Sequence, residues 1–320
     1  MRHHTIIYNP AAAQGKAGER LEEVKAALIA AGLDFTIQLT EKIGHGTDLA
    51  AEAAAGSTDV VVAAGGDGTA NEVINGLMRA AGTRKAAEGR PAFGVICVGR
   101  GNDFAYGAGI PTDVGGGIEV LKTGVEAPLD VGFLRGGDYP DGRHFGNGIG
   151  VGFDTIVGLE AAKLKRVRGF AAYLLGAFKT LLFYYDIPRL RMEIDSRPVV
   201  QECIQVSIMN GQRLGGAFFM APEARTGDGE FDLCIAGKPR RGQMLGLLLR
   251  YMKGTQAESQ HITTGRVRSI TINAEEGTIA VHADGETICI AGTELAVECI
   301  PAALRIVTRA DAAPTEAAAE

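Results

Sequence analysis

The stretch Val61-Val62-Ala63-Ala64-Gly65-Gly66-Asp67-Gly68-Thr69-Ala70-Asn71-Glu72 decides the fold of this chain. It predicts an apolar strand, a glycine-rich turn that holds one acidic residue, and a helix over residues 70–79. The glycines allow positive φ angles, and the helix directs its free N–H groups and the positive end of its dipole at the turn. A plain strand-to-helix turn needs no ligand, but an aspartate between glycines is placed to hold a hydrated metal ion beside phosphates. The sequence therefore predicts an enzyme that handles a nucleotide.

A second glycine-rich loop, Gly99-Arg100-Gly101-Asn102-Asp103-Phe104-Ala105, follows the predicted strand over residues 92–98. Its Asn-Asp pair could simply cap a short helix. Alternatively, Asp103 lies opposite Asp67 and adds negative charge that a magnesium ion and a polyphosphate can share. Ligands of doubly wound sheets bind beyond the carboxyl ends of the strands, so we expect both loops to border one cleft.

The first third of the chain alternates between predicted strands and helices, which is typical of a doubly wound parallel sheet. We expect an N-terminal α/β nucleotide-binding domain over residues 1–128. Its predicted strands cover residues 5–8, 34–40, 59–64 and 92–98, and its predicted helices cover residues 19–31, 47–55 and 70–79.

After residue 127 the apolar residues recur mostly at every second position, which predicts strands over residues 130–134, 190–194, 202–209, 231–236, 269–274, 278–283 and 295–300. We expect a C-terminal antiparallel β-sandwich domain over residues 129–300, interrupted by helices over 159–185 and 243–252. The predicted fold class is thus α/β plus mainly β. An apolar run at 304–307 is predicted to return to the first domain, which would add about 301–309 to it. The Ala/Glu-rich tail, residues 310–320, is predicted to be disordered.

The composition limits the function classes. The chain has 320 residues, which suffices for two domains, and a net charge of -6, which argues against general nucleic-acid binding. Its five cysteines are scattered and form no C-x-x-C pair, which favours reduced core thiols in a cytoplasmic protein over a zinc site or disulfides. Neither a signal peptide nor a transmembrane run is predicted.

Two further turns carry carboxylates in the second half of the chain. Residues 225–232 contain Asp228-Gly229, which is either an ordinary β-turn or a cation site made of a carboxylate and backbone carbonyls. The segment His282-Ala283-Asp284-Gly285-Glu286 predicts a hairpin, and a carboxylate there could also take the proton of an attacking hydroxyl. For this segment taken alone, the hairpin is the favoured interpretation.

Several common motifs are absent. G-x-x-x-x-G-K-[ST] does not occur, G-x-G-x-x-G does not follow the first strand, and no Ser/His/Asp or Cys/His set stands out. The remaining carboxylates and glycines fit direct phosphoryl transfer, where positioning and charge neutralisation dominate. Basic residues at 163–168 precede an amphipathic run over 170–185. We favour packing of this run on the core, with docking on an anionic membrane as a second role.

Five landmarks follow one another along the chain: Asn9-Pro10; Gly65-Gly66-Asp67-Gly68-Thr69 with Asn71-Glu72 and Asn75-Gly76; Gly101-Asn102-Asp103-Phe104-Ala105; Ala221-Pro222 with Asp228-Gly229; and Asp284-Gly285-Glu286. In this order they resemble the soluble bacterial lipid kinases with a diacylglycerol kinase catalytic domain, from about Ile6 to Val307. The first glycine motif alone also resembles NAD kinases and phosphofructokinases, whereas the full ordered set is specific to lipid kinases.

The resemblance implies a peripheral membrane enzyme that uses ATP and Mg²⁺ to phosphorylate the hydroxyl of a diacylglycerol-like lipid. It implies that Glu286 is the general base with Asp284 beside it, and that Asp67 and Asp103 organise the catalytic magnesium. The residues implied to bind ATP are Asn9, Thr40, Gly65, Gly66, Asp67, Gly68, Thr69, Ala70, Asn71, Glu72, Arg100 and Asn102. A structural magnesium site is implied at Asp228 with the backbone carbonyls of Arg225 and Glu230.

The chain departs from the family pattern at two positions. Cys97 stands where Pro is usual, and Arg100 replaces a Thr, so that a charged contact from Arg100 would replace a lost hydroxyl contact to the phosphates. Two other functions stay open: a kinase for a soluble substrate such as NAD, and a nucleotide- or lipid-binding regulator that has lost catalysis. The identity of the lipid and the existence of a homodimer stay open as well.

Overall fold

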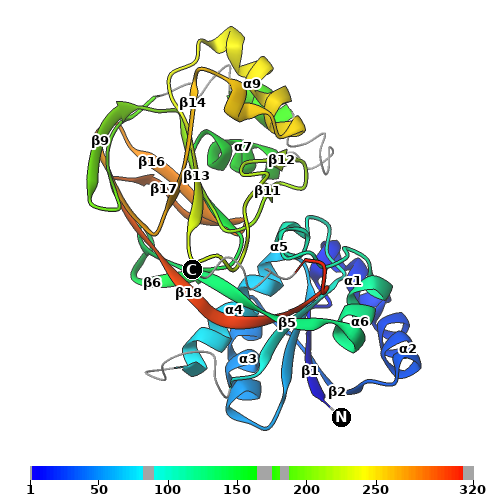
Figure 1. The fold of residues 1–320 in the computed structure, drawn as a ribbon. Helices are drawn as coiled ribbons and strands as arrows, with labels where there is room; N and C mark the ends of the chain where they lie inside the picture. The colour runs from blue at the N-terminus through cyan, green and yellow to red at the C-terminus, as the bar shows by residue number, and fades with distance from the viewer. Residues whose placement is uncertain (1, 82–89, 164–174, 181–186, 313–320) are drawn as a thin grey trace.

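The computed structural model describes residues 2–81, 90–163, 175–180 and 187–312, and they form two domains that share one sheet. Figure 1 shows the α/β domain at the bottom and the β domain at the top. The predicted fold class, α/β followed by mainly antiparallel β, is confirmed. None of the described helices is long and apolar enough to cross a bilayer.

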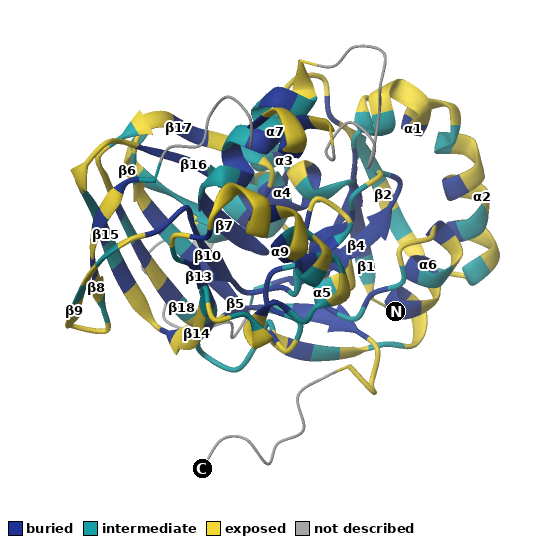
Figure 2. Ribbon diagram, turned by 90° about the horizontal axis from the view of Figure 1, so that it is seen from above, coloured by how far each residue is buried: buried dark blue, intermediate teal, exposed yellow. Residues whose placement is uncertain are grey.

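The N-terminal domain is built on four parallel strands in the order β2-β1-β3-β4. The strands are β1 (His3–Tyr8), β2 (Asp34–Leu39), β3 (Val60–Gly65) and β4 (Ala92–Cys97). The helices are η1 (Ala12–Gly15), α1 (Lys16–Glu19), α2 (Leu21–Ala31), α3 (His45–Ala55), α4 (Asp67–Ala81), α5 (Asp103–Gly107) and α6 (Val114–Thr123). Every residue of β3 and β4 is buried, because helices cover both faces of the sheet (Figure 2).

Alternation along β3 explains the two layers of helices. Val61 and Ala63 contribute to the core under α3 and α4, whereas Val60 and Val62 contribute to the core under α2 and α6. The run of small and β-branched residues that predicted a buried strand therefore serves both faces of the sheet at once.

Helix α4 begins earlier than predicted, at Asp67 rather than at residue 70. The N–H of Ala70 donates to the carbonyl of Gly66 at 3.0 Å, so the glycine turn itself forms the first turn of the helix. The apolar spacing that predicts a helix begins only after this turn, because Asp67 faces a cavity instead of the core.

The C-terminal domain packs two sheets around one apolar core. Its six-stranded antiparallel sheet runs in the order β14-β13-β10-β7-β16-β17. These strands are β7 (Gly148–Gly152), β10 (Gln205–Met209), β13 (Phe231–Ala236), β14 (Ile262–Val267), β16 (Ile279–Ala283) and β17 (Glu286–Gly292). The other elements are β5 (Val125–Gly136), β6 (Tyr139–Phe145), α7 (Phe153–Ala162), β8 (Arg189–Ile194), β9 (Arg197–Glu202), β11 (Arg213–Leu214), β12 (Phe218–Phe219), α9 (Arg241–Lys253), η2 (Gln256–Glu258), β15 (Ser269–Glu276) and β18 (Glu294–Thr308).

Strand β18 joins the two domains into one ten-stranded sheet of order β2-β1-β3-β4-β18-β15-β8-β9, with β5 and β6 attached beside β18. Its first half pairs with β15, and near its end Ile306 pairs with Phe93 of β4. The predicted strand over 295–300 and the apolar run at 304–307 thus form one long strand, with an irregularity between Ile300 and Leu304.

Three sequence predictions in this domain are corrected. The expected helix over 159–185 starts at Phe153; residues 175–180 are also helical, and 164–174 and 181–186 lie outside the described residues. The expected strand over 202–209 is the end of β9 and the whole of β10, which lie in different sheets. The glycine-rich strand β7 was not expected, although it lies inside the six-stranded sheet. The five cysteines are buried and unpaired, as predicted.

Candidate active site

The two glycine-rich loops pack on each other at the carboxyl ends of β3 and β4, as predicted. The N–H groups of Val98 and Gly99 donate to the carbonyl of Gly65 at 3.0 and 2.9 Å. A Cβ atom on Gly99 would lie 2.4 Å from the Cα of Gly66, a distance that real side chains do not reach. The loops therefore form one surface rather than two separate turns.

The carboxylates of Asp67 and Asp103 both lie close to Gly101. A Cβ atom on Gly101 would lie 2.6 Å from Oδ2 of Asp67 and 3.9 Å from Oδ2 of Asp103. Burial, and then the charge of Asp103, raises the pKa of Asp67 to about 6, although the N–H of Phe104 donates to its Oδ1 at 2.9 Å. Burial also raises the pKa of Asp103. Two buried carboxylates with raised pKa values fit a divalent cation, because a cation would stabilise their charged forms.

Arg213 brings a positive charge from the second domain to this site. Its Nε donates to Oδ1 of Asp103 at 2.9 Å, and the N–H of Gly216 donates to the same carboxylate at 3.0 Å. The guanidinium also lies 3.9 Å from the centre of the Tyr106 ring. The sequence gives no signal for Arg213, because the contact joins residues far apart in the chain.

Several predicted ATP-binding residues gather at the carboxyl ends of the strands. Asn9 follows β1, and its Nδ2 donates to Oγ1 of Thr69 at 3.0 Å. Thr40 follows β2, and its N–H donates to the carbonyl of Tyr8 at 2.9 Å. Asn102 has a φ of 54°, and its buried Oδ1 has no hydrogen-bond partner among the described residues. A donor on a ligand would satisfy this acceptor.

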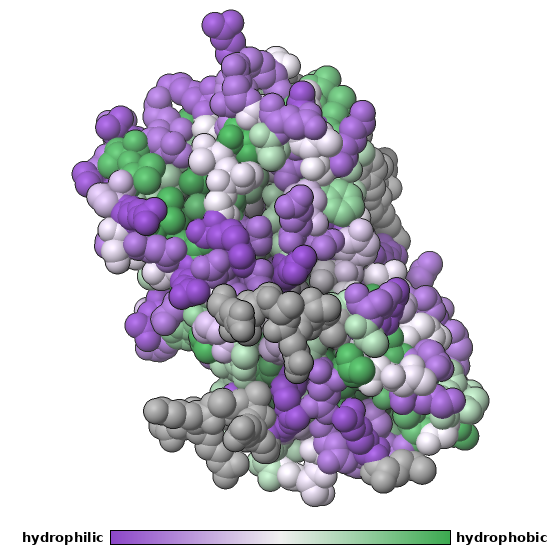
Figure 3. All heavy atoms as spheres, viewed as in Figure 1, coloured by the Kyte–Doolittle hydropathy of each residue, from purple (hydrophilic) through white to green (hydrophobic). Residues whose placement is uncertain are grey.

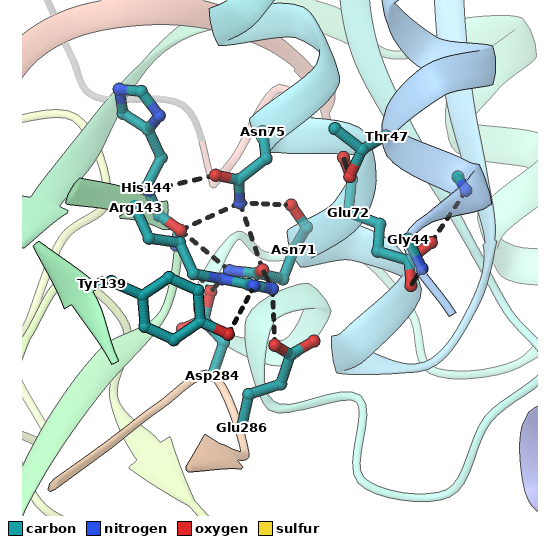
Figure 4. A network of polar contacts seen from close by, with 12 residues as sticks. Gly44, Thr47, Asn71, Glu72, Asn75, Tyr139, Arg143, His144, Asp284 and Glu286 are labelled. Atoms are coloured by element: carbon teal, nitrogen blue, oxygen red, sulfur yellow. Dashed lines mark hydrogen bonds and ion pairs between the residues drawn. The ribbon is translucent and has the colours of Figure 1, made fainter. Parts of the chain in front are cut away.

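The side chain of Glu72, another predicted ATP-binding residue, already has hydrogen-bond partners in the protein. The carboxylate of Glu72 accepts hydrogen bonds from the N–H groups of Gly44 and Gly46, both at 2.8 Å, and so caps the start of α3 (Figure 4). Arg100 is exposed. Their contacts with ATP stay predictions, as do those of the main chain from Gly65 to Asn71.

Asp284 accepts four hydrogen bonds, one of which comes from the N-terminal domain. Its Oδ2 accepts from the N–H of Gly146 at 2.7 Å and from Nδ2 of Asn71 in α4 at 2.8 Å. Its Oδ1 accepts from the N–H groups of Asn147 and Gly148, both at 2.9 Å. The Asp284 carboxylate is therefore fully hydrogen-bonded and fixes the β16–β17 turn against α4, which favours a positioning role.

Glu286 forms an ion pair with Arg143 instead of standing free. Nη2 of Arg143 lies 2.5 Å from Oε2 of Glu286 and 2.8 Å from Oδ1 of Asn71, and the guanidinium lies over the Tyr139 ring (Figure 4). Burial raises the pKa of Glu286, and Arg143 partly offsets that rise. Arg143 carries no sequence signal, because β6 reaches α4 only through the fold.

At the implied structural magnesium site, arginine side chains of the protein already pair with the carboxylates. Asp228 pairs with Arg266, and Glu230 pairs with Arg266 at 3.2 Å and with Arg268 at 3.3 Å. Among the described residues, no group of three or more His, Cys, Asp or Glu side chains is arranged to hold a metal ion. Arg266 therefore neutralises the side chain of Asp228 in this structure, and the part of Arg225, Asp228 and Glu230 in metal binding stays a prediction.

Two cavities of the described part of the chain share one lining residue, Asp154. A polar cavity of about 330 Å³ lies between the domains and is lined by Asp67, Asp103 and Asp284, among others. An apolar cavity of about 550 Å³ lies in the second domain. Its wall is mainly apolar and includes Phe153, Val157, Leu175, Phe178, Ile204, Phe218, Met220, Met244, Leu247, Leu248 and Tyr251. Asp154 lines both cavities.

The fold and the site define a class, the two-domain proteins of the diacylglycerol kinase and NAD kinase fold. Residues 3–134 match the diacylglycerol kinase catalytic domain. Residues 147–308 match the YegS C-terminal NAD kinase beta sandwich-like domain. The boundary between these matches falls inside the β5–β6 region.

Relatives of known name place the chain within this class. It is 31% identical over 293 residues to a diacylglycerol kinase of Bacillus subtilis, a match that covers 89% of this chain and 90% of the relative. It is 29% identical over 282 residues to a diacylglycerol kinase of Staphylococcus saprophyticus, a match that covers 88% of this chain and 88% of the relative. The crystal structure of a diacylglycerol kinase from Bacillus anthracis has the same fold, with a TM-score of 0.72, 22% identity, and coverage of 97% of this chain and 98% of that one. The chain belongs to the bacterial diacylglycerol kinase family.

Proposed function

We propose that the protein is an ATP- and Mg²⁺-dependent lipid kinase that transfers the γ-phosphate of ATP to the hydroxyl of a diacylglycerol-like lipid. One observation carries this proposal: a polar cavity with two buried carboxylates and an apolar cavity share Asp154 as a lining residue. A substrate with a reactive hydroxyl and long hydrocarbon chains would fill both cavities at once.

The phosphates of ATP would lie at the glycine loops, near the N-terminus of α4. The N–H groups of the first helical turn would donate to them, and Asn102 would contribute near the second loop. Asp67 and Asp103 would hold a magnesium ion, which would neutralise the negative charge that develops on the transferred phosphoryl group. Arg213 keeps Asp103 in place for this task.

In the transfer, the acceptor oxygen forms a bond to the γ-phosphorus, and the bond from that phosphorus to the β–γ bridging oxygen breaks. ADP leaves with the electron pair of the broken bond. The proton of the acceptor hydroxyl passes to a carboxylate, for which Glu286 is the predicted base. Since Arg143 pairs with Glu286, we expect Arg143 to set the basicity of this carboxylate.

The apolar cavity would take the acyl chains. Each methylene that enters it would contribute roughly 0.8 kcal/mol of transfer free energy. Leu175, Phe178 and Leu245 line this cavity and are exposed, and Leu249 of α9 is exposed as well. Apolar surface is visible beside α9 in Figure 3. Exposed Arg240 and Lys253 flank α9. This combination suits a peripheral contact with an anionic membrane from which the lipid enters.

The test is transfer of label from [γ-³²P]ATP, with Mg²⁺, to a panel of diacylglycerol, ceramide and phosphatidylglycerol in mixed micelles, with NAD and a lipid-free reaction alongside. We expect label in one or more lipids. Label in NAD alone would replace the proposal with a kinase for a soluble substrate. ATP binding without transfer to any acceptor would replace it with a regulator that has lost catalysis.

A further inference from the structure

Among the described residues, Asp154 is the one that lines both the polar and the apolar cavity. It is the second residue of α7, is 4% exposed, and belongs to the wall of both cavities. Asp67 and Asp103 line the polar cavity on the side of the N-terminal domain. A lipid with its chains in the apolar cavity would therefore present its polar head to Asp154 before it reaches the other two carboxylates.

His282 on β16 holds the carboxylate of Asp154. Its Nε2 lies 3.3 Å from Oδ2 of Asp154, and its buried Nδ1 has no partner among the described residues. The N–H of Thr155 donates to Oδ1 of Asp154 at 2.8 Å, and Nε2 of Gln205 lies 3.4 Å from Oδ2. The carboxylate is thus oriented from several sides while it still borders both cavities.

The glycine at position 150 makes room for this pair. A Cβ atom on Gly150 would lie 2.0 Å from Oδ2 of Asp154 and 2.3 Å from Nε2 of His282. Gly150 faces His282 across the β7–β16 pairing. The unexpected glycine strand β7 therefore has a physical reason, because a side chain there would push Asp154 and His282 apart.

Glu286, the predicted base, is placed differently. Its neighbours Gly285 and Thr287 line the polar cavity, whereas Glu286 is not among the described residues that line it. Glu286 instead points to Arg143 (Figure 4). Asp154, rather than Glu286, is therefore the carboxylate that lines both the proposed lipid cavity and the acidic cavity.

We propose that Asp154, positioned by His282, is the subsite that binds the head of the acceptor lipid, and that it selects neutral lipids with a free hydroxyl. The carboxylate accepts a hydrogen bond from the hydroxyl and orients its oxygen towards the Asp67–Asp103 site. A lipid whose head carries a phosphate is disfavoured, because its negative charge would enter a cavity lined by the carboxylates of Asp67, Asp103, Asp154 and Asp284. This inference rests on the proposed lipid kinase function and names its substrate class.

The test compares wild type with Asp154→Asn and His282→Gln, and uses Asp141→Asn as a matched control at an exposed position. The KM and kcat for diacylglycerol and for phosphatidylglycerol are measured in mixed micelles, together with the KM for ATP and the lipid-free hydrolysis of ATP. Binding of a fluorescent diacylglycerol without ATP is measured in parallel.

For Asp154→Asn we expect the KM for diacylglycerol to rise about 10- to 100-fold, the range for one hydrogen bond to a charged group. The preference for diacylglycerol over phosphatidylglycerol should shrink, and the KM for diacylglycerol should change by a larger factor than the KM for ATP. The control Asp141→Asn should keep the wild-type lipid KM, ATP KM and basal hydrolysis. His282→Gln should raise the lipid KM by a smaller factor, and it decides the matter if Asp154→Asn does not fold.

An unchanged lipid KM in the folded variants, or a wild type that prefers phosphatidylglycerol, would overturn the subsite while the kinase function stands. A wild type that binds diacylglycerol without phosphorylating it would overturn the function, and loss of that binding in Asp154→Asn would still support the subsite. A wild type that neither binds nor phosphorylates a lipid overturns both.

Discussion

Asp67 shows how a single residue can serve function at a cost in stability. Burial and Asp103 raise its pKa to about 6 in the folded protein, above the usual value of 3.8. A carboxyl group with a raised folded pKa binds its proton more tightly when folded, so its ionisation destabilises the fold. This cost is absent below about pH 4 and fully present above about pH 6.

Replacing Asp67 with Asn should therefore stabilise the protein and inactivate it at the same time. Without Mg²⁺ at pH 8, we expect Asp67→Asn to raise the free energy of unfolding by about 2–3 kcal/mol, the equivalent of the raised pKa. At pH 4 the gain should vanish. Urea unfolding at both pH values measures it, with Asp141→Asn as a control that should show no gain. Equal stability of variant and wild type at pH 8 would show that Asp67 is not destabilised by its surroundings.

The same pKa predicts the acid limb of the activity profile. The value of kcat/KM, measured with limiting lipid, reports on the free enzyme. If a charged Asp67 holds the cation, kcat/KM should fall as the pH drops below about 6. Above about pH 6, Asp67→Ala should cost at least ~10³-fold in kcat, because it removes a preorganised electrostatic contact. A profile that stays flat down to pH 4.5 would argue that another group holds the cation.

Sequence reasoning reached residues that lie in motifs and missed residues that arrive through the fold. Asp67 and Asp103 stand in glycine-rich loops, so their chemistry could be predicted and their proximity follows from parallel strands. Arg213 and Arg143 occupy strands that carry no motif; Arg213 meets Asp103 across the domain boundary, and Arg143 meets Glu286 from a strand far away in the sequence. Neither could be predicted from local pattern.

At the scale of elements, α9 combines two tasks on opposite faces. Met244, Leu247 and Tyr251 are buried against the domain, whereas Leu245 and Leu249 are 60% and 50% exposed. Exposed leucines one turn apart are costly in water unless another surface covers them. A membrane is the surface that the proposed lipid substrate requires.

The double variant Leu245→Gln/Leu249→Gln should bind vesicles of phosphatidylglycerol and phosphatidylcholine less well than wild type, by about tenfold or more, because it removes two apolar insertions. Its activity on a water-soluble short-chain diacylglycerol should be unchanged. The control Leu247→Met keeps volume and should keep vesicle binding. Undiminished vesicle binding by the double variant would place the membrane contact elsewhere.

Helices and strands were predicted most accurately where the apolar residues follow a single clear pattern. Strands β3 and β4 are uniform apolar runs and lie within a residue of their expected limits. Strand β7 was missed because three of its five residues are glycine, which has little intrinsic preference for strands. Tertiary packing decides there, since Gly150 must leave space for Asp154 and His282.

At the scale of the whole molecule, the domains share a sheet and are fixed together by buried polar contacts. Strand β18 pairs with strands of both domains, and Asp284 links the β16–β17 turn to Asn71. Since the core of each domain depends on this common strand, we expect one cooperative unfolding transition rather than two.

Truncating Asp284 should weaken that connection. Asp284→Ala leaves the N–H groups of Gly146, Asn147 and Gly148 without their acceptor. We expect a loss of about 3 kcal/mol or more in the free energy of unfolding, because buried donors are left unsatisfied. Calorimetry should show a lower midpoint, whereas the control Asp141→Ala should unfold like wild type. An unchanged midpoint would mean that the domains do not depend on this carboxylate.

The central claim is that one enzyme binds a nucleotide at its acidic cleft and a lipid beside it. The most direct measurement is the transfer of ³²P from [γ-³²P]ATP to diacylglycerol in mixed micelles by wild type and by Asp67→Asn in parallel. We predict labelled phosphatidic acid with wild type and a loss of at least ~10³-fold with the folded variant. Equal labelling by both proteins, or no lipid labelling by a wild type that binds ATP, would contradict the account.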